Sequence, residues 1–347
     1  MTSRSPNHDA LPASWTVGTV VVLGTGGTIA GEAAQATDNV GYTAAQRSVQ
    51  ALVAGVPALA GLPLECEQVA QLDSKDMRPA IWAALARRCA AHLARPEVAG
   101  VVVTHGTDTL EETAWLLHRV LAPWHALKPV VMTAAMRPAT SLQADGPQNL
   151  LDAVTLARAP GAHGVLLALA GSVWAGAEAR KGHPWRLEAF HGGDAPPVAL
   201  IREGAVRPLR PWPEAEAAGP AAPSVDQLPE DDAGWPWVET VASHAGADGR
   251  FVEALVRADV HGLVVAATGN GSVHHALEAA LVQAAAAGVP VLRATRCQGG
   301  GIVEGSGAAS DDGSSQAAAL ASAGALTPAQ ARVELMLRLL ATRQPGG

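Results

Sequence analysis

The stretch Gly100–Glu112, with the sequence GVVVTHGTDTLEE, constrains the fold more than any other part of the chain. Its apolar, β-branched run Val101–Thr104 predicts a buried strand, which ends abruptly at a histidine and a glycine. A polar turn follows, and then apolar residues recur at helical spacing at Leu110, Ala114, Leu117 and Leu121. A strand, a short polar turn and a helix start are typical of an open α/β sheet, where ligands bind outside the carboxyl ends of the strands.

The polar turn of this stretch has two interpretations. Thr109 and Glu112 have the spacing of a capping box, which would explain the start of the helix without any functional role. That box leaves Thr107 and Asp108 without a structural task. On these residues alone, a helix cap and a functional turn both remain open.

The composition predicts a folded protein of about two domains. The chain has 347 residues, of which 48% are hydrophobic and 16% charged, and this balance fits a packed core and not a disordered chain. A net charge of −8 offers no electrostatic footprint for nucleic acid. No uninterrupted apolar run is long enough to cross a bilayer. We therefore expect no nucleic-acid partner and no membrane partner.

The cysteines and the first residues predict a cytoplasmic location. Cys66, Cys89 and Cys297 are far apart, odd in number and form no CxxC pair, so reduced thiols fit better than a disulfide framework or a structural zinc site. The opening sequence MTSRSPNHDALPASW is polar and lacks the apolar centre of a secretory signal.

Alternating strands and helices predict an α/β fold. Besides the strand at Val101–Thr104, the first half of the chain contains four further predicted strands, at Val17–Leu23, Val69–Leu72, Pro129–Thr133 and Gly164–Ala170. A predicted helix at Ile81–Ala94 lies between the second of these and Val101–Thr104. This order makes a mostly parallel sheet flanked by helices. Six prolines between Gly204 and Gly234 indicate a linker. We predict a larger N-terminal domain over residues 1–205, a linker over 206–235 and a smaller C-terminal α/β domain over 236–347.

A hydroxyl residue follows three of the predicted strands. Thr28 stands in the glycine turn Gly24–Gly31, and Ser74 and Thr107 follow two other strands. The turn lacks the third glycine of a dinucleotide-binding fingerprint, and the chain has no Gly-Lys-Ser/Thr of a phosphate-binding loop. An ordinary hairpin remains possible. The alternative is a turn that exposes the hydroxyls of Thr25 and Thr28 beside backbone N–H groups able to form an oxyanion hole.

These residue types suit acyl transfer. A threonine can act as a nucleophile if a neighbour accepts its proton, and a lysine can be that base when burial lowers its pKa. Lys181 lies in the loop after the strand predicted at Gly164–Ala170, where a lone lysine is usually just solvated. Asp108 offers a carboxylate to a substrate ammonium group. The chain has no GxSxG and no HExxH motif, and the adjacent His274 and His275 would point to different faces of a helix. We therefore expect no metal site.

Two motifs, VLGTGGTIAG and GVVVTHGTDTLEETA, closely resemble those of the bacterial L-asparaginases, the asparaginase/glutaminase amidohydrolase family. The segments DSKDM, KPVVMTAAMRPATSLQADGPQNL, TGNG and SAGALTPAQAR also look like family segments and occur in order, so that the resemblance covers nearly the whole chain. It implies hydrolysis of L-asparagine to L-aspartate and ammonia, with neither a metal nor an organic cofactor.

The resemblance also implies roles for single residues. Thr28 would be the nucleophile that forms an acyl-enzyme intermediate, and Tyr42, the only tyrosine in the chain, would lie beside it on a mobile lid. Thr107, Asp108 and Lys181 would form a second catalytic set of hydroxyl, carboxylate and amine.

Substrate binding and assembly follow from the same resemblance. Ser74 and Asp108 would hold the α-carboxylate and the α-ammonium group, and Lys75, where secreted members commonly carry glutamine, joins the substrate-binding residues. The family usually forms homotetramers, built as dimers of dimers, and Asn270 would reach the site of a neighbouring subunit. A glutamate that the partner supplies in the family has no clear counterpart, and Glu304 is the only acid nearby before Asp311.

Two other functions remain open. The first is a related amidohydrolase that acts on glutamine or on the amide of a transamidating complex. The second is an amino-acid-binding sensor that has kept the pocket and lost the chemistry. The joint presence of Thr28, Thr107, Asp108 and Lys181 argues against the sensor, because binding alone would not need the lysine.

Overall fold

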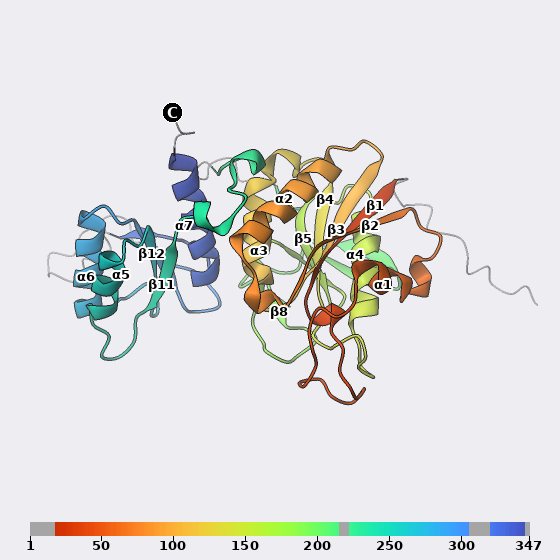
Figure 1. Ribbon diagram of the computed structural model, residues 1–347, viewed down its shortest axis with the longest axis horizontal. Helices are drawn as coiled ribbons and strands as arrows, with labels where there is room; N and C mark the ends of the chain where they lie inside the picture. Colours follow the sequence, from red (N-terminus) through yellow and green to blue (C-terminus); the bar gives the residue numbers. More distant parts are fainter. Residues whose placement is uncertain (1–17, 215–221, 305–319, 344–347) are drawn as a thin grey trace, which may run out of the picture.

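The structure is a computed structural model that describes residues 18–214, 222–304 and 320–343. The polar opening residues, on which the predicted location partly depends, lie outside this part of the chain. Two α/β domains lie side by side, each with its own sheet (Figure 1). The larger domain contains the N-terminal part of the chain, and the smaller domain contains the C-terminal part, as the sequence predicts.

The larger domain is organised around an eight-stranded sheet with the strand order β10-β9-β6-β5-β4-β3-β1-β2. Its strands are β1 (Thr19–Gly26), β2 (Leu64–Leu72), β3 (Val98–Thr104), β4 (Pro129–Thr133), β5 (Gly164–Leu169), β6 (Ser172–Ala175), β9 (Ala199–Arg202) and β10 (Ala205–Pro208). Strands β1 to β5 are parallel, and β6, β9 and β10 continue the sheet in antiparallel fashion. The carboxyl ends of the parallel strands therefore share one edge.

Helices cover both faces of this sheet, because its central strands are buried on both sides. Val21 and Leu23 of β1 pack on the side of α2 (Pro79–Leu93) and α3 (Leu110–Val120). Their neighbours in β1 face the opposite way and pack on the side of α1 (Val49–Ala54) and α4 (Gly146–Ala157). Continuous runs of apolar residues are typical of such doubly covered parallel strands.

The antiparallel edge of the sheet was not predicted. Ala170 and Gly171, with φ of 51° and 73°, turn the chain back directly after β5, and the four-residue strand β6 follows. Strands this short carry too few residues to show an alternating pattern. The hairpin of β9 and β10 continues the sheet to Pro208, so the predicted domain boundary after residue 205 falls inside β10.

The described part of the predicted linker packs against the larger domain. The 3₁₀ helix η5 (Val225–Gln227) contacts α2, and Leu228 is buried there. Arg87 of α2 donates a hydrogen bond to the carbonyl of Leu228, and the Asp232 carboxylate accepts one from the N–H of Ala80 at 2.9 Å. The proline-rich segment thus covers α2 before it leads to the second domain.

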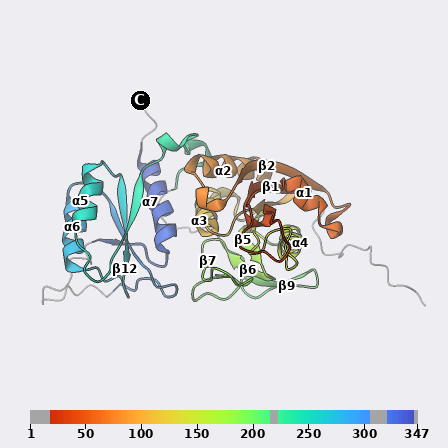
Figure 2. The ribbon, with the colours of Figure 1, turned by 60° about the horizontal axis from the view of Figure 1, so that its bottom comes forward.

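The smaller domain contains a four-stranded parallel sheet in the order β11-β12-β13-β14. Its elements are β11 (Val238–Ala242), α5 (Arg250–Arg257), β12 (Gly262–Ala267), α6 (His275–Ala286), β13 (Val291–Thr295), β14 (Ala321–Ser322) and α7 (Pro328–Thr342). Figure 2 shows α5 and α6 on the outer face of this sheet and α7 on the face toward the larger domain. Helix α7 also packs against α3, which joins the two domains.

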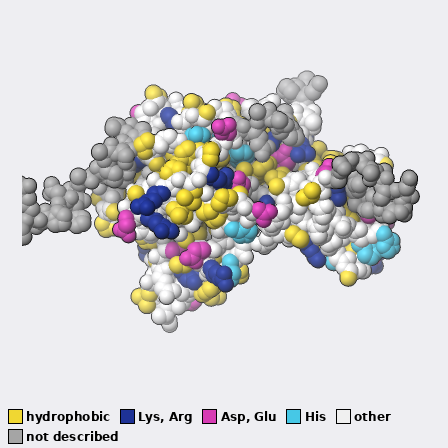
Figure 3. Space-filling model, turned by 180° about the vertical axis from the view of Figure 1, so that it is seen from behind, with side chains coloured by type: hydrophobic (Ala, Val, Ile, Leu, Met, Phe, Trp, Pro, Cys, Tyr) yellow, Lys and Arg dark blue, Asp and Glu magenta, His cyan; other side chains and the backbone are white. Residues whose placement is uncertain are grey.

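The surface shows the same division. Seen from behind, the two domains form separate lobes, and hydrophobic side chains gather on part of the larger lobe (Figure 3). None of the helices in the described part of the chain has the length and apolar character that crossing a bilayer requires.

Candidate active site

Three turns meet at the carboxyl ends of the adjacent strands β2, β1 and β3. A Cβ atom added to Gly27 would lie 2.4 Å from Cα of Gly106, and one added to Gly106 would lie 2.4 Å from Oγ of Ser74. Gly27 also has a φ of +82°, which favours glycine. The two glycines therefore allow close approach of the turns that contain Thr28, Ser74 and Thr107.

Thr28 forms a pair with Tyr42. Thr28 begins the 3₁₀ helix η1 (Thr28–Ala30) directly after β1, and its side chain lies 2.7 Å, Oγ1 to Oη, from Tyr42. Only 8% of Thr28 is exposed. The ring of Tyr42 packs against Gly31, where a Cβ atom would come within 2.8 Å of the ring. The loop that carries the tyrosine thus delivers its hydroxyl to the predicted nucleophile.

The hydroxyl of Thr25 is not exposed, contrary to the sequence-based expectation. Strand β1 continues to Gly26, so that Thr25 is a strand residue with its side chain inside the sheet. Its hydroxyl donates a hydrogen bond to the carbonyl of Thr104 at 3.0 Å. Of the two threonines in the glycine turn, only Thr28 therefore lies with the other turn residues at the strand ends.

A second polar set forms around Lys181, which lies in the short strand β7 (Arg180–Lys181) paired with β8 (Phe190–His191). Its Nζ donates to Oγ1 of Thr107 at 2.8 Å and lies 2.6 Å from Oδ1 of Asp108. The lysine side chain is 18% exposed, and that of Asp108 is 55% exposed. Thr107, Asp108 and Lys181 are thus in direct contact, although more than 70 residues of chain separate the lysine from the other two.

Ser74 connects the β2 turn to the β3 turn. Its Oγ accepts a hydrogen bond from the N–H of Asp108 at 3.2 Å, and its carbonyl accepts one from the hydroxyl of Thr109 at 2.8 Å. Of the two interpretations of this turn, the capping box is wrong, because the Thr109 side chain makes no cap hydrogen bond to α3. Glu112, the other half of that box, instead lies 3.3 Å from Arg332 of α7.

His105 is a structural residue of the site that the sequence reasoning missed. It is fully buried, with Nδ1 2.7 Å from the carbonyl of Gly106 and Nε2 3.0 Å from the hydroxyl of Thr113. That hydroxyl accepts in turn from the indole N–H of Trp82 at 2.8 Å. Burial lowers the pKa of His105 to about 4, so the neutral ring supports the turn that precedes Thr107.

Glu111 is a second residue that the sequence reasoning missed. Its carboxylate accepts the backbone N–H of Lys181 at 2.8 Å, and burial raises its pKa. Glu111 lies in the first turn of α3, four residues after Thr107 in the chain. Only the folded chain shows this contact, because a sequence does not show which backbone N–H meets a helix carboxylate.

Lys75 and Asn270 do not join these residues within the single chain. The Lys75 side chain is exposed and pairs with the neighbouring Asp76. Asn270 lies in the smaller domain, where its amide exchanges two 2.8 Å hydrogen bonds with the backbone of Val303. Glu304 lies 4.0 Å from Arg293. In the described residues, no group of three or more histidine, cysteine, aspartate or glutamate side chains is arranged to hold a metal ion.

Comparison with known proteins places both domains in one family. Residues 19–213 match the family model described as Asparaginase, N-terminal, and residues 237–346 match that of the Glutaminase/Asparaginase C-terminal domain. These two ranges cover nearly all of the described residues.

Individual relatives share much of the chain. L-asparaginase 2 of Escherichia coli (strain K12) is 34% identical over 329 residues, which cover 94% of this chain and 90% of the relative. A glutaminase-asparaginase of Pseudomonas fluorescens biotype A is 33% identical over 82% of this chain and 77% of its own. The crystal structure of a probable cytoplasmic L-asparaginase from Campylobacter jejuni is similar with a TM-score of 0.80 and 31% identity, over 94% of this chain and 97% of that one. The chain therefore belongs to the asparaginase family of amidohydrolases.

Proposed function

We propose that this enzyme hydrolyses L-asparagine to L-aspartate and ammonia through an acyl-enzyme on Thr28. The single observation that carries the proposal is the contact of the turns that contain Thr28 and Thr107, one with a tyrosine partner and the other with a lysine and a carboxylate. The relatives named as asparaginases support the substrate class.

Thr28 and Tyr42 carry the first half of the reaction. The oxygen of Thr28 attacks the amide carbon, an ester bond to Thr28 forms, and the C–N bond breaks. The hydroxyl proton leaves Thr28 through its hydrogen-bond partner, Tyr42, and reaches the departing nitrogen as ammonia forms. Water then attacks the ester carbon, which releases L-aspartate and restores the threonine hydroxyl. The reaction balances with water as the only co-substrate.

Thr107, Lys181 and Asp108 polarise the reacting groups. An amine 2.8 Å from the Thr107 hydroxyl can hold that hydroxyl, or a water bound to it, in position for proton transfer. The carboxylate of Asp108 stabilises the positive charge on Lys181. Because Asp108 uses one oxygen for the lysine, its second oxygen is free to accept the α-ammonium group of the substrate, and Ser74 binds the α-carboxylate.

Assembly completes the site. We infer a homotetramer built as a dimer of dimers, in which Asn270 of a partner subunit approaches Thr28. Within its own chain the amide of Asn270 belongs to the smaller domain, while Thr28, Ser74 and Thr107 belong to the larger one. Activity measured across a dilution series, with the mass followed by light scattering, tests this inference. A fully active monomer would contradict it.

The cytoplasm is the location that the cysteines support. All three are free thiols in the structure, Cys89 buried and Cys297 exposed, as is usual for proteins that remain in a reducing compartment. Among the relatives both locations occur by name, since one from Haemophilus influenzae is called periplasmic and the one from Campylobacter jejuni cytoplasmic. Detection of the native protein in separated cytoplasmic and periplasmic fractions tests this location.

One assay separates the candidate functions. Ammonia release from L-asparagine distinguishes the enzyme from an amino-acid-binding sensor, and the same assay with L-glutamine measures the preference. Ser74 and Asp108 fix the two α-groups, so one extra methylene should displace the amide and lower kcat/KM by roughly ten- to two-hundredfold. Equal kcat/KM values would refute the preference, and binding of asparagine without ammonia release would favour the sensor.

A further inference from the structure

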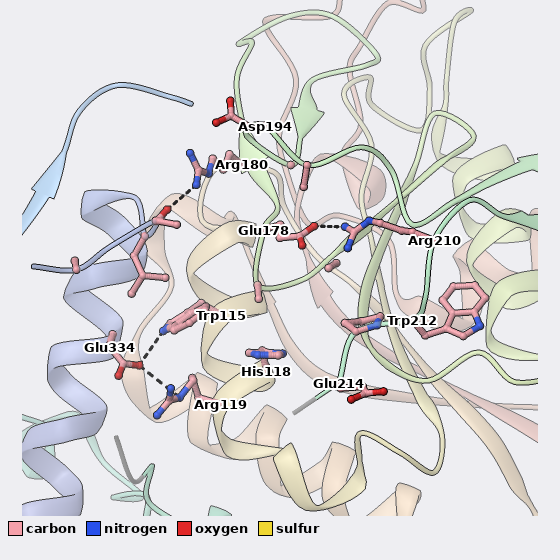
Figure 4. A pocket seen from close by; sticks show the side chains of 18 of the residues that line it. Trp115, His118, Arg119, Glu178, Arg180, Asp194, Arg210, Trp212, Glu214 and Glu334 are labelled. Atoms are coloured by element: carbon pink, nitrogen blue, oxygen red, sulfur yellow. Dashed lines mark hydrogen bonds and ion pairs between the residues drawn. The ribbon is translucent and has the colours of Figure 1, made fainter. Parts of the chain in front are cut away.

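Strand β7 lies at a joint between the two domains. The guanidinium group of Arg180 donates to the carbonyls of Gln298 at 2.5 Å and of Ala325 at 2.6 Å, both in the smaller domain. Arg180 is 9% exposed and lines a cleft of about 780 Å³ between α3, α7 and the segment after β6 (Figure 4). A buried cation thus holds the start of β7 against the smaller domain.

The next residue of the same strand is Lys181, and its side chain points away from the joint. Successive side chains of a strand lie on opposite faces, so Arg180 reaches the smaller domain while Lys181 reaches Thr107 and Asp108. Strand β7 has only two residues and pairs only with the equally short β8. Its position therefore depends on side-chain contacts more than on the sheet.

Glu111 adds a second connection between the lysine and the smaller domain. One oxygen of its carboxylate accepts the backbone N–H of Lys181 at 2.8 Å, and the other accepts the hydroxyl of Thr327 at 3.3 Å. Thr327 is the N-cap of α7, and its hydroxyl also accepts the N–H of Gln330. The backbone of Lys181 is thus held on one side through Glu111 and on the other through Arg180.

We propose that Arg180 is a positioning residue for Lys181, through which the smaller domain of the same chain fixes the amine beside Thr107. This inference depends on the proposed function, because it assigns Lys181 a part in turnover. A lysine side chain has four rotatable bonds, and catalysis requires its amine at a fixed distance from its partner. A displacement of about 1 Å can cost roughly a hundredfold in rate.

A double-mutant cycle tests this role. Arg180→Met keeps an aliphatic stem and removes both carbonyl contacts, Lys181→Met removes the amine, and the double variant combines them. Arg210→Met is the matched control, because Arg210 lines the same cleft but bonds to the Glu178 carboxylate and the Pro196 carbonyl, which both lie outside β7 (Figure 4). Ammonia release from L-asparagine gives kcat and KM for each purified variant.

We expect Arg180→Met to lower kcat by about 10- to 100-fold while KM changes much less, and Arg210→Met to leave kcat near the native value. Because Arg180 acts through Lys181, the double variant should be no slower than Lys181→Met alone. Multiplying losses, or a native kcat in Arg180→Met, would overturn the proposal. If Arg180→Met does not fold, the cycle is run with Arg180→Lys, for which an intermediate kcat and the same non-additivity are expected.

The outcomes separate this inference from the proposed function. If the native enzyme releases ammonia and Lys181→Met is impaired, multiplying losses overturn only the role of Arg180. If Lys181→Met retains native kcat, both the role of the lysine and that of Arg180 are wrong. If the native protein releases no ammonia from asparagine, the proposed function fails, and the role of Arg180 fails with it.

Discussion

The two halves of the site are held in different ways. One half is Thr28 with its partner Tyr42, which a surface loop, residues 32–48, holds in place. That loop contacts a second surface loop, residues 138–143. The other half is the turn that contains Thr107. It is held by packed elements, since the buried His105 bonds to Thr113 of α3 and Lys181 of β7 bonds to Thr107 itself. Regions with few buried contacts open first, so the comparison indicates that the Tyr42 loop can move while the Thr107 turn stays in place.

A few hydrogen bonds connect the two surface loops. The N–H of Ala33 donates to the hydroxyl of Thr140 at 2.8 Å, and the hydroxyl of Ser141 donates to the Asn39 side chain at 2.6 Å. Two backbone bonds, to the carbonyls of Gly31 and Ala36, complete the contact. Single large apolar residues at the tips of both loops, Val40 and Leu142, are 76% and 78% exposed. The loops therefore contact each other mainly through polar bonds that water can replace.

Removal of the proposed nucleophile should have the largest effect. Thr28→Ala deletes the oxygen that we propose forms the acyl-enzyme, so turnover should fall at least about a thousandfold while the fold survives. Ammonia release and mass spectrometry of the enzyme during turnover measure this, because only the native enzyme can gain an acyl group at residue 28. Thr43→Ala, in the same loop as Tyr42, is the control. Near-native turnover of Thr28→Ala would assign the nucleophile elsewhere.

Removal of the lysine amine should reduce turnover less, because the nucleophile and the substrate contacts remain. Lys181→Met keeps the aliphatic stem, and we expect a fall of roughly 10² to 10⁴-fold in kcat with aspartate still bound. Turnover and aspartate affinity should be measured on one preparation. Lys128→Met is the control, since Lys128 bonds only to carbonyls at the end of α2. Unchanged turnover, or loss of binding together with the fold, would make Lys181 a structural residue.

The sequence predicted the parallel part of the fold well. The strand predicted at Pro129–Thr133 has the bounds of β4, and the helix predicted at 81–94 begins only two residues earlier, at Pro79. These elements have apolar patterns long enough to predict a strand or a helix from the sequence alone. The short antiparallel strands β6, β9 and β10 lack such patterns, and only pairing with their neighbours defines them.

The parallel strands also predict which turn residues lie together at the site, but not the residues that reach it from other elements. Thr28, Ser74 and Thr107 follow adjacent parallel strands, so their common edge follows from topology. The arrival of Lys181 beside Thr107 required the resemblance to a family. The roles of His105 and Glu111 depend on partners that only the folded chain brings together, namely Thr113 and the backbone N–H of Lys181.

The buried His105 beside the Thr107 turn should make the stability of the protein depend on pH. Burial lowers the pKa of His105 from 6.5 to about 4, so the unfolded chain binds this proton more readily than the folded one. The contribution of His105 is therefore fully present above about pH 6.5 and is lost as the pH falls toward 4. At pH 5 the loss is about 2 kcal/mol. Urea unfolding between pH 7.5 and 4.5 measures it.

A variant isolates this histidine from the others. The pKa values of His118 and His125 are also lowered by burial, to about 3 and about 4, and they act in the same direction. His105→Gln should show a smaller loss of stability on acidification than the native protein, while the exposed His275→Gln should match the native slope. An unchanged slope in His105→Gln would mean that His105 is not held neutral by the fold.

The mobile half should give the smallest effect. Ser141→Ala removes one side-chain hydrogen bond between the two loops, worth about 1 kcal/mol or roughly fivefold in the closed-to-open ratio. Because Tyr42 then meets Thr28 less often, kcat/KM should fall by up to about fivefold, while urea unfolding stays native. A loop that is mostly closed would instead keep kcat/KM near the native value and gain up to about fivefold in tryptic cleavage after Arg47, since cleavage follows the population of the open loop. Ser224→Ala, at the start of η5 and far from either loop, is the control. If cleavage and kcat/KM both stay native in Ser141→Ala, this bond does not hold the loop, and the contrast between a mobile and a rigid half loses its simplest explanation.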